Sequence, residues 1–232
     1  QNVILIDRES QLPTVGQLVA WNPEPAMQVA AARVDGVRPG VAHTRAVVLT
    51  EGLVIVLDRV ESGTTHEYDF AYHNFGEFAP GEGWTLAPSG NPLGTTANLE
   101  SIVDLTRAEG PAPFKGTWTL APINGKDGEA RLHVWHASAP QGTIHVGVTG
   151  MNNPDTKKVP DMAPSIFSRV SGQTAHFMTV LEPAREASRV QSVAGVDGGG
   201  VDVTLADGKK RSFKLDELIA RYRVASEGKD GR

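Results

Sequence analysis

A histidine and an arginine stand two residues apart in the segment VAHTRAVVLT, residues 41–50. Alternate side chains of a strand share one face, so His43 and Arg45 are expected to project together. A guanidinium beside an imidazole could bind an anionic sugar in a cleft. A surface ladder, in which Arg45 pairs with a carboxylate, is the commoner outcome of such spacing.

A second candidate ends the run HEYDFAYH, residues 66–73. Alternation places its aromatic side chains on one face, expected to be the core face, and Asp69 and His73 on the other. These two lie two strand repeats apart, so the carboxylate could orient the imidazole only indirectly. His73 and Asn74 could contact sugar hydroxyls at the strand end. A histidine bonded to a backbone carbonyl is the structural alternative.

Other residue types suggest chemistry less directly. His133 and His136 fall on opposite faces of RLHVWHA if that segment is a strand, so this pair does not predict a zinc site. Trp84 lies in a Gly- and Pro-rich stretch, residues 78–94, and could stack on a sugar ring, because an aromatic face suits the apolar C–H side of a carbohydrate. A lid over the core is the alternative for Trp84.

Several catalytic classes lack their motif. The sequence contains no Gly-x-Ser-x-Gly elbow, no Gly-x-Gly-x-x-Gly turn and no His-Glu-x-x-His helix. The glycines of residues 195–208 flank the alternating VDVTL, which predicts a terminal hairpin rather than a phosphate loop. Carboxylate pairs for glycoside hydrolysis have no characteristic spacing and gain no positive support.

Composition limits the partners. The 232 residues are 40% hydrophobic, enough for one large β domain or two small ones. With 22 basic and 27 acidic residues the net charge is −5, which argues against nucleic acid or an anionic membrane as main partner. Cysteine is absent, which excludes disulfides, thiolate metal sites and a cysteine nucleophile. No transmembrane helix or signal peptide is expected, so Gln1 is predicted to follow a cleavage or a boundary.

The elements that must position these residues are predicted to be strands. Short runs rich in Val, Ile, Thr and aromatic residues, separated by turn residues, predict an all-β antiparallel sandwich. Glu51 and Gly52 predict a tight hairpin, and residues 53–57 a central strand covered on both faces. Asp216 is expected to cap a short helix over residues 217–223. The predicted strands cover residues 3–7, 28–34, 43–50, 53–60, 66–73, 99–105, 116–121, 130–137, 144–149, 175–182, 201–205 and 210–214.

Several segments occur in an order that resembles a known family. They are QNVILIDRESQ at the start, HTRAVVL, YHNFG, GTWTLAPINGKDGEARLHVW and SRVSGQTAHFMTVLEP. In these the chain resembles the C-terminal β-sandwich of heparinase II/III-like polysaccharide lyases. The resemblance implies that a sandwich at residues 1–190 packs on an upstream α-helical toroid, in the same or a second chain. A terminal hairpin and short helix at 191–224 would pack on the sandwich, and 225–232 would form a flexible tail.

The resemblance also implies a reaction. Family lyases remove the C5 proton of a uronate and expel the C4-linked sugar, with tyrosine and histidine as base and acid and a polar or cationic group on the carboxylate. Most of those residues would precede Gln1, so no catalytic residue is assigned. Gln1 replaces a histidine that is often a zinc ligand in the family, and two further ligands would precede it, so no metal or other cofactor is expected. The expected substrate contacts are Asn2, His43, Arg45, His73, Asn74 and Trp84.

The predicted function is therefore the sandwich part of a lyase that cleaves an acidic, uronate-containing polysaccharide or oligosaccharide by β-elimination. The chain would form one wall of the cleft, in a periplasmic or secreted protein without nucleic-acid or membrane partners. A non-catalytic carbohydrate-binding or scaffold module is the main alternative, because no complete catalytic set is present. An epimerase or mutarotase would need a histidine and a glutamate facing one cleft, and ranks last.

Overall fold

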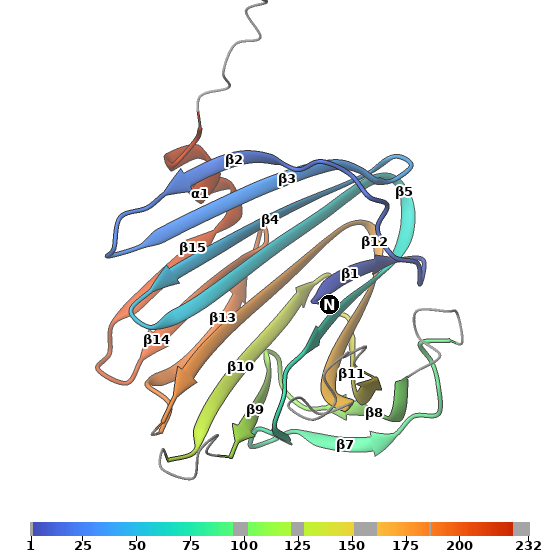
Figure 1. Ribbon diagram of the computed structural model, residues 1–232, viewed down its shortest axis with the longest axis vertical. Helices are drawn as coiled ribbons and strands as arrows, with labels where there is room; N and C mark the ends of the chain where they lie inside the picture. Colours follow the sequence, from blue (N-terminus) through green and yellow to red (C-terminus); the bar gives the residue numbers. More distant parts are fainter. Residues whose placement is uncertain (1, 95–101, 122–127, 151–161, 186, 225–232) are drawn as a thin grey trace, which may run out of the picture.

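The chain forms two antiparallel sheets and one short helix in a computed structural model that describes residues 2–94, 102–121, 128–150, 162–185 and 187–224 (Figure 1). The all-β antiparallel sandwich predicted from the sequence is confirmed. No helix among these residues is long and apolar enough to span a membrane. The elements are β1 (Val3–Ile6), β2 (Gln17–Asn22), β3 (Gln28–Arg38), β4 (Val41–Thr50), β5 (Leu53–His73), β6 (Glu77–Pro80), β7 (Thr85–Pro88), β8 (Ile102–Glu109), β9 (Phe114–Leu120), β10 (Ala130–Ala139), β11 (Thr143–Gly150), β12 (Met162–Ala184), β13 (Val190–Val196), β14 (Gly200–Leu205), β15 (Lys210–Lys214) and α1 (Leu215–Arg221).

Two long strands create the sandwich. β5 and β12 pair along most of their length, and a register irregularity between Gly172 and Thr174 divides the pairing. The first half of β5 belongs to a layer ordered β2-β3-β4-β5-β12-β10-β9-β6, whereas its second half pairs with β1. β11, β8 and β7 extend from the first half of β12. The same two strands therefore run through both layers, as their curvature shows (Figure 1).

The core between the layers consists of side chains that alternate inward. One cluster joins β1 with both halves of β5 and β12, through residues such as Ile4, Tyr68, Phe70 and Phe177. Tyr68 and Phe70 are buried, in keeping with the expected core face of this strand. A second cluster around Trp118 joins β9 and β10 to β11. Each aromatic side chain so buried removes a large apolar area from water, which stabilises the packing of the layers.

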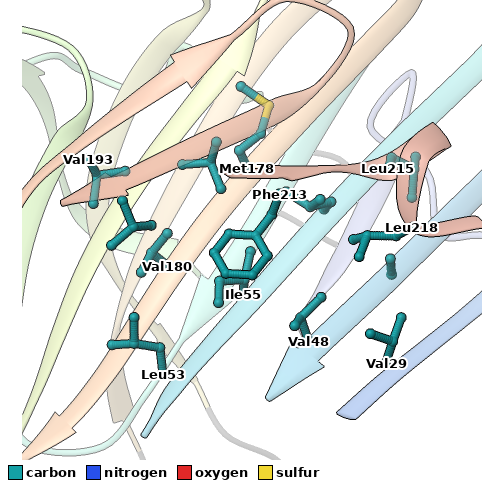
Figure 2. Close-up of a cluster of buried hydrophobic side chains, with 14 of the residues drawn as sticks. Val29, Val48, Leu53, Ile55, Met178, Val180, Val193, Phe213, Leu215 and Leu218 are labelled. Atoms are coloured by element: carbon teal, nitrogen blue, oxygen red, sulfur yellow. The ribbon is translucent and has the colours of Figure 1, made fainter. Parts of the chain in front are cut away.

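A third layer covers the outer face of the β2–β5 region. β13, β14 and β15 form a small sheet, and α1 follows it directly. Figure 2 shows Phe213, Leu215 and Leu218 of this layer beside Ile55 and Val48 of the large sheet. Only this face of the 53–57 strand is fully covered, because Leu53, Ile55 and Leu57 are buried while the alternate valines are half-buried. The predicted central position of this strand, between β4 and β12, is confirmed, and its second face is less completely covered than expected.

Turn residues behave as their sequence predicts. Thr50 pairs with Leu53 across the Glu51-Gly52 turn, whose φ angles of 49° and 75° lie in the left-handed region. This conformation matches the twist of a two-residue hairpin and confirms it. The helix differs from the prediction, since α1 begins at Leu215 after Lys214 as N-cap. Asp216 lies in the first turn and pairs with Arg59 instead of capping.

Candidate functional site

Four of the six predicted contact residues are connected by hydrogen bonds, and two of them bind one buried carboxylate. His43 and Arg45 share a face of β4, and Asp58 of β5 lies directly opposite Arg45 in the strand register. Arg45 donates from Nε to Oδ1 of Asp58 at 2.6 Å and from Nη2 to Oδ2 at 3.1 Å. His43 Nε2 lies 2.6 Å from Oδ1 of the same carboxylate. Both predicted side chains therefore bind Asp58.

The N-terminal segment completes the group. Arg45 Nη1 donates to the backbone carbonyl of Asn2 at 3.2 Å, and the backbone N–H of His73 donates to Oδ1 of Asn2 at 2.8 Å. Contacts thus run from β4 through the start of the chain to the end of β5. We call Asn2, His43, Arg45, Asp58 and His73 the Asp58 cluster. Asn74 follows it, and its Oδ1 accepts the N–H of Phe75 at 3.0 Å.

Arg45 and His43 offset the negative charge of the buried Asp58. Asp58 is 1% exposed, and burial alone would raise its pKa, yet Arg45 and His43 hold the pKa below its ordinary value. Since the carboxylate only accepts, His43 donates to it from Nε2, and its Nδ1 can accept from Gln11 at 3.3 Å. His43 is thus engaged on both ring nitrogens. Arg45 remains the partly exposed member, at 30% of its side chain.

His73 is the cluster's other accessible group. Its ring is half-buried at the end of β5, and burial lowers its pKa, so that the imidazole is neutral at pH 7. A neutral imidazole offers one donor and one acceptor nitrogen to a sugar hydroxyl. The two tyrosines of the same strand differ from a catalytic base, because burial raises the pKa of Tyr68 and raises that of Tyr72 to about 12.

Trp84 lies apart from the Asp58 cluster. It is placed between the short strands β6 and β7, and its indole packs edge-on to Phe114 with ring centroids 4.9 Å apart. It also lines a pocket whose wall includes no member of the Asp58 cluster. The structure therefore separates the predicted stacking residue from the predicted polar contacts.

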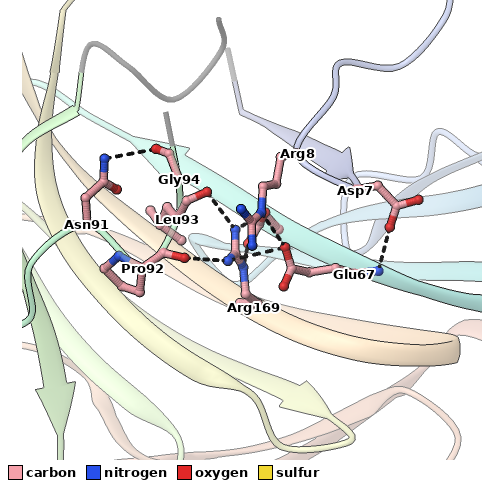
Figure 3. A network of polar contacts seen from close by, with 9 residues as sticks. Asp7, Arg8, Glu67, Asn91, Pro92, Leu93, Gly94 and Arg169 are labelled. Carbon is pink, nitrogen blue, oxygen red and sulfur yellow. Dashed lines mark hydrogen bonds and ion pairs between the residues drawn. The ribbon is translucent and has the colours of Figure 1, made fainter. Parts of the chain in front are cut away.

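A buried ion pair near the second layer was missed by the sequence reasoning. Asp69 is fully buried, and Arg169 of β12 binds both its oxygens at 2.6 and 2.8 Å. Arg169 also donates to the carbonyl oxygens of Pro92 and Leu93, and it contacts Glu67 (Figure 3). A charge in the middle of an apolar strand was the available signal for Asp69, as it was for Asp58. Neither partner could be named, because each lies on another strand.

Metal ligands are not gathered in this part of the chain. Across the residues that the structure describes, no three His, Asp or Glu side chains are arranged to hold an ion. His133 and His136 occupy opposite faces of β10, where His136 stacks on Phe70 with centroids 4.5 Å apart. Gln1, the position at which the family resemblance implied a lost zinc ligand, lies outside the described residues.

Comparisons with known proteins agree on the fold. No protein-family model matches the chain, and no curated protein matches it either. Among solved structures it is similar to a mutant of the heparan sulfate lyase HepC from Pedobacter heparinus, with a TM-score of 0.63 and 12% identity over 93% of this chain. A heparinase III gene product has a TM-score of 0.64 and 14% identity over 92% of this chain. Another heparinase III structure has a TM-score of 0.62 and 13% identity over 91% of this chain.

These structural similarities establish only the sandwich fold, because sequence identities this low are evidence for the fold and not for a shared activity. The chain spans 30%, 30% and 29% of the length of those three solved chains. It therefore has the fold of one part of a heparinase III chain.

Proposed function

We propose that this chain is the C-terminal β-sandwich part of a polysaccharide lyase, which cleaves a uronate-containing polysaccharide by β-elimination. The observation that carries the proposal is the structural likeness to heparinase III chains over more than nine-tenths of this chain. An acidic polysaccharide substrate and a periplasmic or secreted location belong to the same proposal. The chain would form one wall of the substrate cleft.

The Asp58 cluster supplies the groups for that wall. Arg45 uses three N–H groups on Asp58 and Asn2, and its guanidinium has further donors for a uronate carboxylate. Neutralising that carboxylate makes the C5 proton more acidic. His73 and Asn74 would bind sugar hydroxyls beside it. Asp58 holds the guanidinium of Arg45 in place through two hydrogen bonds, so it is a positioning residue and would not touch the substrate.

An upstream helical domain or second chain would supply the base. Tyr68 and Tyr72 are unsuited to this role, because burial raises the pKa of both. The face that carries His43 and Arg45 also carries exposed apolar side chains on β2 and β4. Leu18, Trp21 and Leu49 are 47%, 53% and 42% exposed there. Such side chains are typical of a surface that another domain covers.

The first test is the native mass of the purified protein, followed by activity. If a helical polypeptide travels with this chain, the complex should release products with a new C4–C5 double bond from heparan sulfate, alginate or an unsulfated glucuronan, detected by ultraviolet absorbance. His73→Ala should then lower kcat/KM by about tenfold or more with the fold intact. His66→Ala, on the same strand but bonded to Asp7, is the matched control. Full activity of the His73→Ala complex would refute a role for His73 in the cleft.

A non-catalytic carbohydrate-binding or scaffold module is the second candidate. It is favoured by the pairing of Arg45 with Asp58 and by the raised pKa values of Tyr68 and Tyr72, which make these two tyrosines unsuited to act as the base. This candidate predicts that the chain alone binds acidic oligosaccharides saturably and generates no double bond. Turnover by the chain alone would reject it.

A further inference from the structure

A pocket of about 620 Å³ is lined by no residue of the Asp58 cluster. Its wall is formed by the end of β8, the start of β9, the β10–β11 turn and the end of β13. This volume lies within the range of small-molecule sites in proteins. None of the residues assigned to the acidic polysaccharide lines it except Trp84.

Aromatic rings form one part of the wall. Trp84 and Phe114 both line the pocket and meet edge-on. Gly110 allows this arrangement, since a Cβ there would lie 2.6 Å from the indole of Trp84 and 2.7 Å from the carbonyl oxygen of Gly83. The backbone of Gly110 therefore packs directly against the indole and fixes its position. An indole that is half-buried and fixed in position offers an apolar surface to the C–H face of a sugar ring.

Hydrogen-bonding groups lie along the rest of the wall. Ser138 accepts the backbone N–H of Gly142 at 3.0 Å, so its hydroxyl proton is available to a ligand. Gln141 offers both a donor and an acceptor from the adjoining turn. Glu109 and Asp197 add carboxylates, which accept hydrogen bonds from hydroxyl groups. A few polar groups set in a partly apolar wall are typical of a ligand site.

The charge of the pocket discriminates between sugars. Arg107 is the one permanent cation among its lining residues, and it faces Glu109 at 3.7 Å, while Asp197 adds a second carboxylate. His136 contributes no positive charge, since burial lowers its pKa to about 3. The lining side chains therefore sum to a formal charge of −1 at pH 7. A uronate or sulfate group would meet net repulsion there.

We propose that this pocket is a second saccharide site, which takes an uncharged sugar with one ring stacked on Trp84. Glu109, Ser138, Gln141 and Asp197 would bind its hydroxyl groups. The site differs from the proposed lyase cleft in its lining residues, which include no member of the Asp58 cluster, and in favouring an uncharged rather than an anionic sugar. A chain with both sites could hold a neutral glycan while an acidic one occupies the cleft.

Isothermal titration of the 232-residue chain with maltose, cellobiose and lactose tests the proposal. At least one of these should bind saturably, and Trp84→Ala should weaken it by about tenfold. Trp84→Phe keeps an aromatic ring and should lose less affinity than Trp84→Ala. It allows the test to be made even if the alanine variant misfolds. Asp197→Asn, at an exposed position, should weaken binding by a smaller factor. Trp21→Ala removes an exposed tryptophan outside the pocket and should change nothing.

The unsulfated chondroitin disaccharide, which carries a uronate, is the ligand control. It should bind more weakly than the neutral sugar, and its binding should not depend on Trp84. The proposal is overturned if none of the three neutral disaccharides binds saturably, or if folded Trp84 variants bind them as tightly as the native chain. Tighter, Trp84-dependent binding of the chondroitin disaccharide would also overturn it. None of these outcomes bears on lyase activity, so the two proposals fail separately.

Discussion

Asp58 carries its negative charge inside the sandwich, and the groups that surround it determine the effect of removing that charge. Asp58→Asn would leave Arg45 facing a neutral amide. We expect the free energy of unfolding to fall by about 3 kcal/mol, because breaking one side of a buried ion pair leaves the other uncompensated. Urea denaturation measures this. Asp207→Asn, in an exposed pair with Lys209, is the control and should change stability little.

His136 predicts a dependence of stability on pH. Burial lowers its pKa from 6.5 to about 3, although the nearby charge of Asp58 opposes this. Below pH 6.5, His136 therefore binds a proton in the unfolded chain but not in the folded chain. The free energy of unfolding falls as the pH drops from 6.5 toward 3. The slope for one proton is at most about 1.4 kcal/mol per pH unit.

His136→Phe keeps a ring against Phe70 and removes the titration. Urea midpoints measured between pH 7 and pH 4 should fall less steeply for this variant than for the native chain. Burial also lowers the pKa of His73, His145 and His176, but these are common to both proteins, so the difference isolates His136. Parallel curves would contradict the assignment.

Sequence reasoning identified members of the Asp58 cluster but not its centre. The shared face of His43 and Arg45 follows from strand alternation, which is local. Asp58 could be suspected, since a charge inside LVIVLDRV requires a partner, but the partner lies on another strand. Glu182 is a parallel case, since it is fully buried and bound by Ser188 and Arg189. Pairings of this kind depend on strand order and register, which alternation does not reveal.

At the scale of elements, Arg169 links β12 to β5 and to the segment at residues 92–93. It lies opposite Asp69 in the pairing of β5 with β12 and also binds the carbonyl oxygens of the 92–93 segment. Burial raises the pKa of Asp69, and Arg169 opposes that rise. Arg169→Met should therefore lower stability by about 3–5 kcal/mol and expose residues 89–94 to hydrogen exchange.

A double variant separates the charge from the packing. Asp69→Asn combined with Arg169→Met removes both charges, so it should lose less stability than the sum of the two single variants. Additive losses in this cycle would show that the pair is not coupled.

Strand positions were predicted well where apolar alternation is strong. The strands within a few residues of expectation are β1, β3, β4, β9, β10, β11, β14 and β15. The predicted strand 99–105 overlaps β8 from Ile102, and its residues 99–101 lie outside the described residues. β5 was divided in two because ESGTT, residues 61–65, looks like a turn, yet the strand bends there without ending. β2, β6, β7, β13 and the first half of β12 were missed. β2, β6, β7 and β13 are edge strands, which have little pattern of their own and form because a neighbour offers free hydrogen-bonding groups. This reason does not apply to the first half of β12, which lies between β5 and β11.

At the scale of the whole molecule, the third layer is expected to unfold together with the sandwich. Phe213 of β15 is 3% exposed and packs in the cluster that contains Val48, Ile55 and Val180. Phe213→Ala should cost about 3–5 kcal/mol. Far-ultraviolet circular dichroism and tryptophan fluorescence should still report one coincident urea transition. Two separate transitions would show that residues 191–224 fold independently.

The two long strands that join the layers also govern how the chain reaches its structure. Asp69 and Arg169 pair across a sequence separation of 100 residues, and the rest of the β5–β12 ladder spans similar distances. A fold that depends on such distant pairings has a high contact order, and its folding is slow because a long loop must close before the β5–β12 ladder forms. Until β12 arrives, β5 has an unpaired edge along both layers. Other chains can pair with such an edge, so dilute refolding should give more native protein than concentrated refolding.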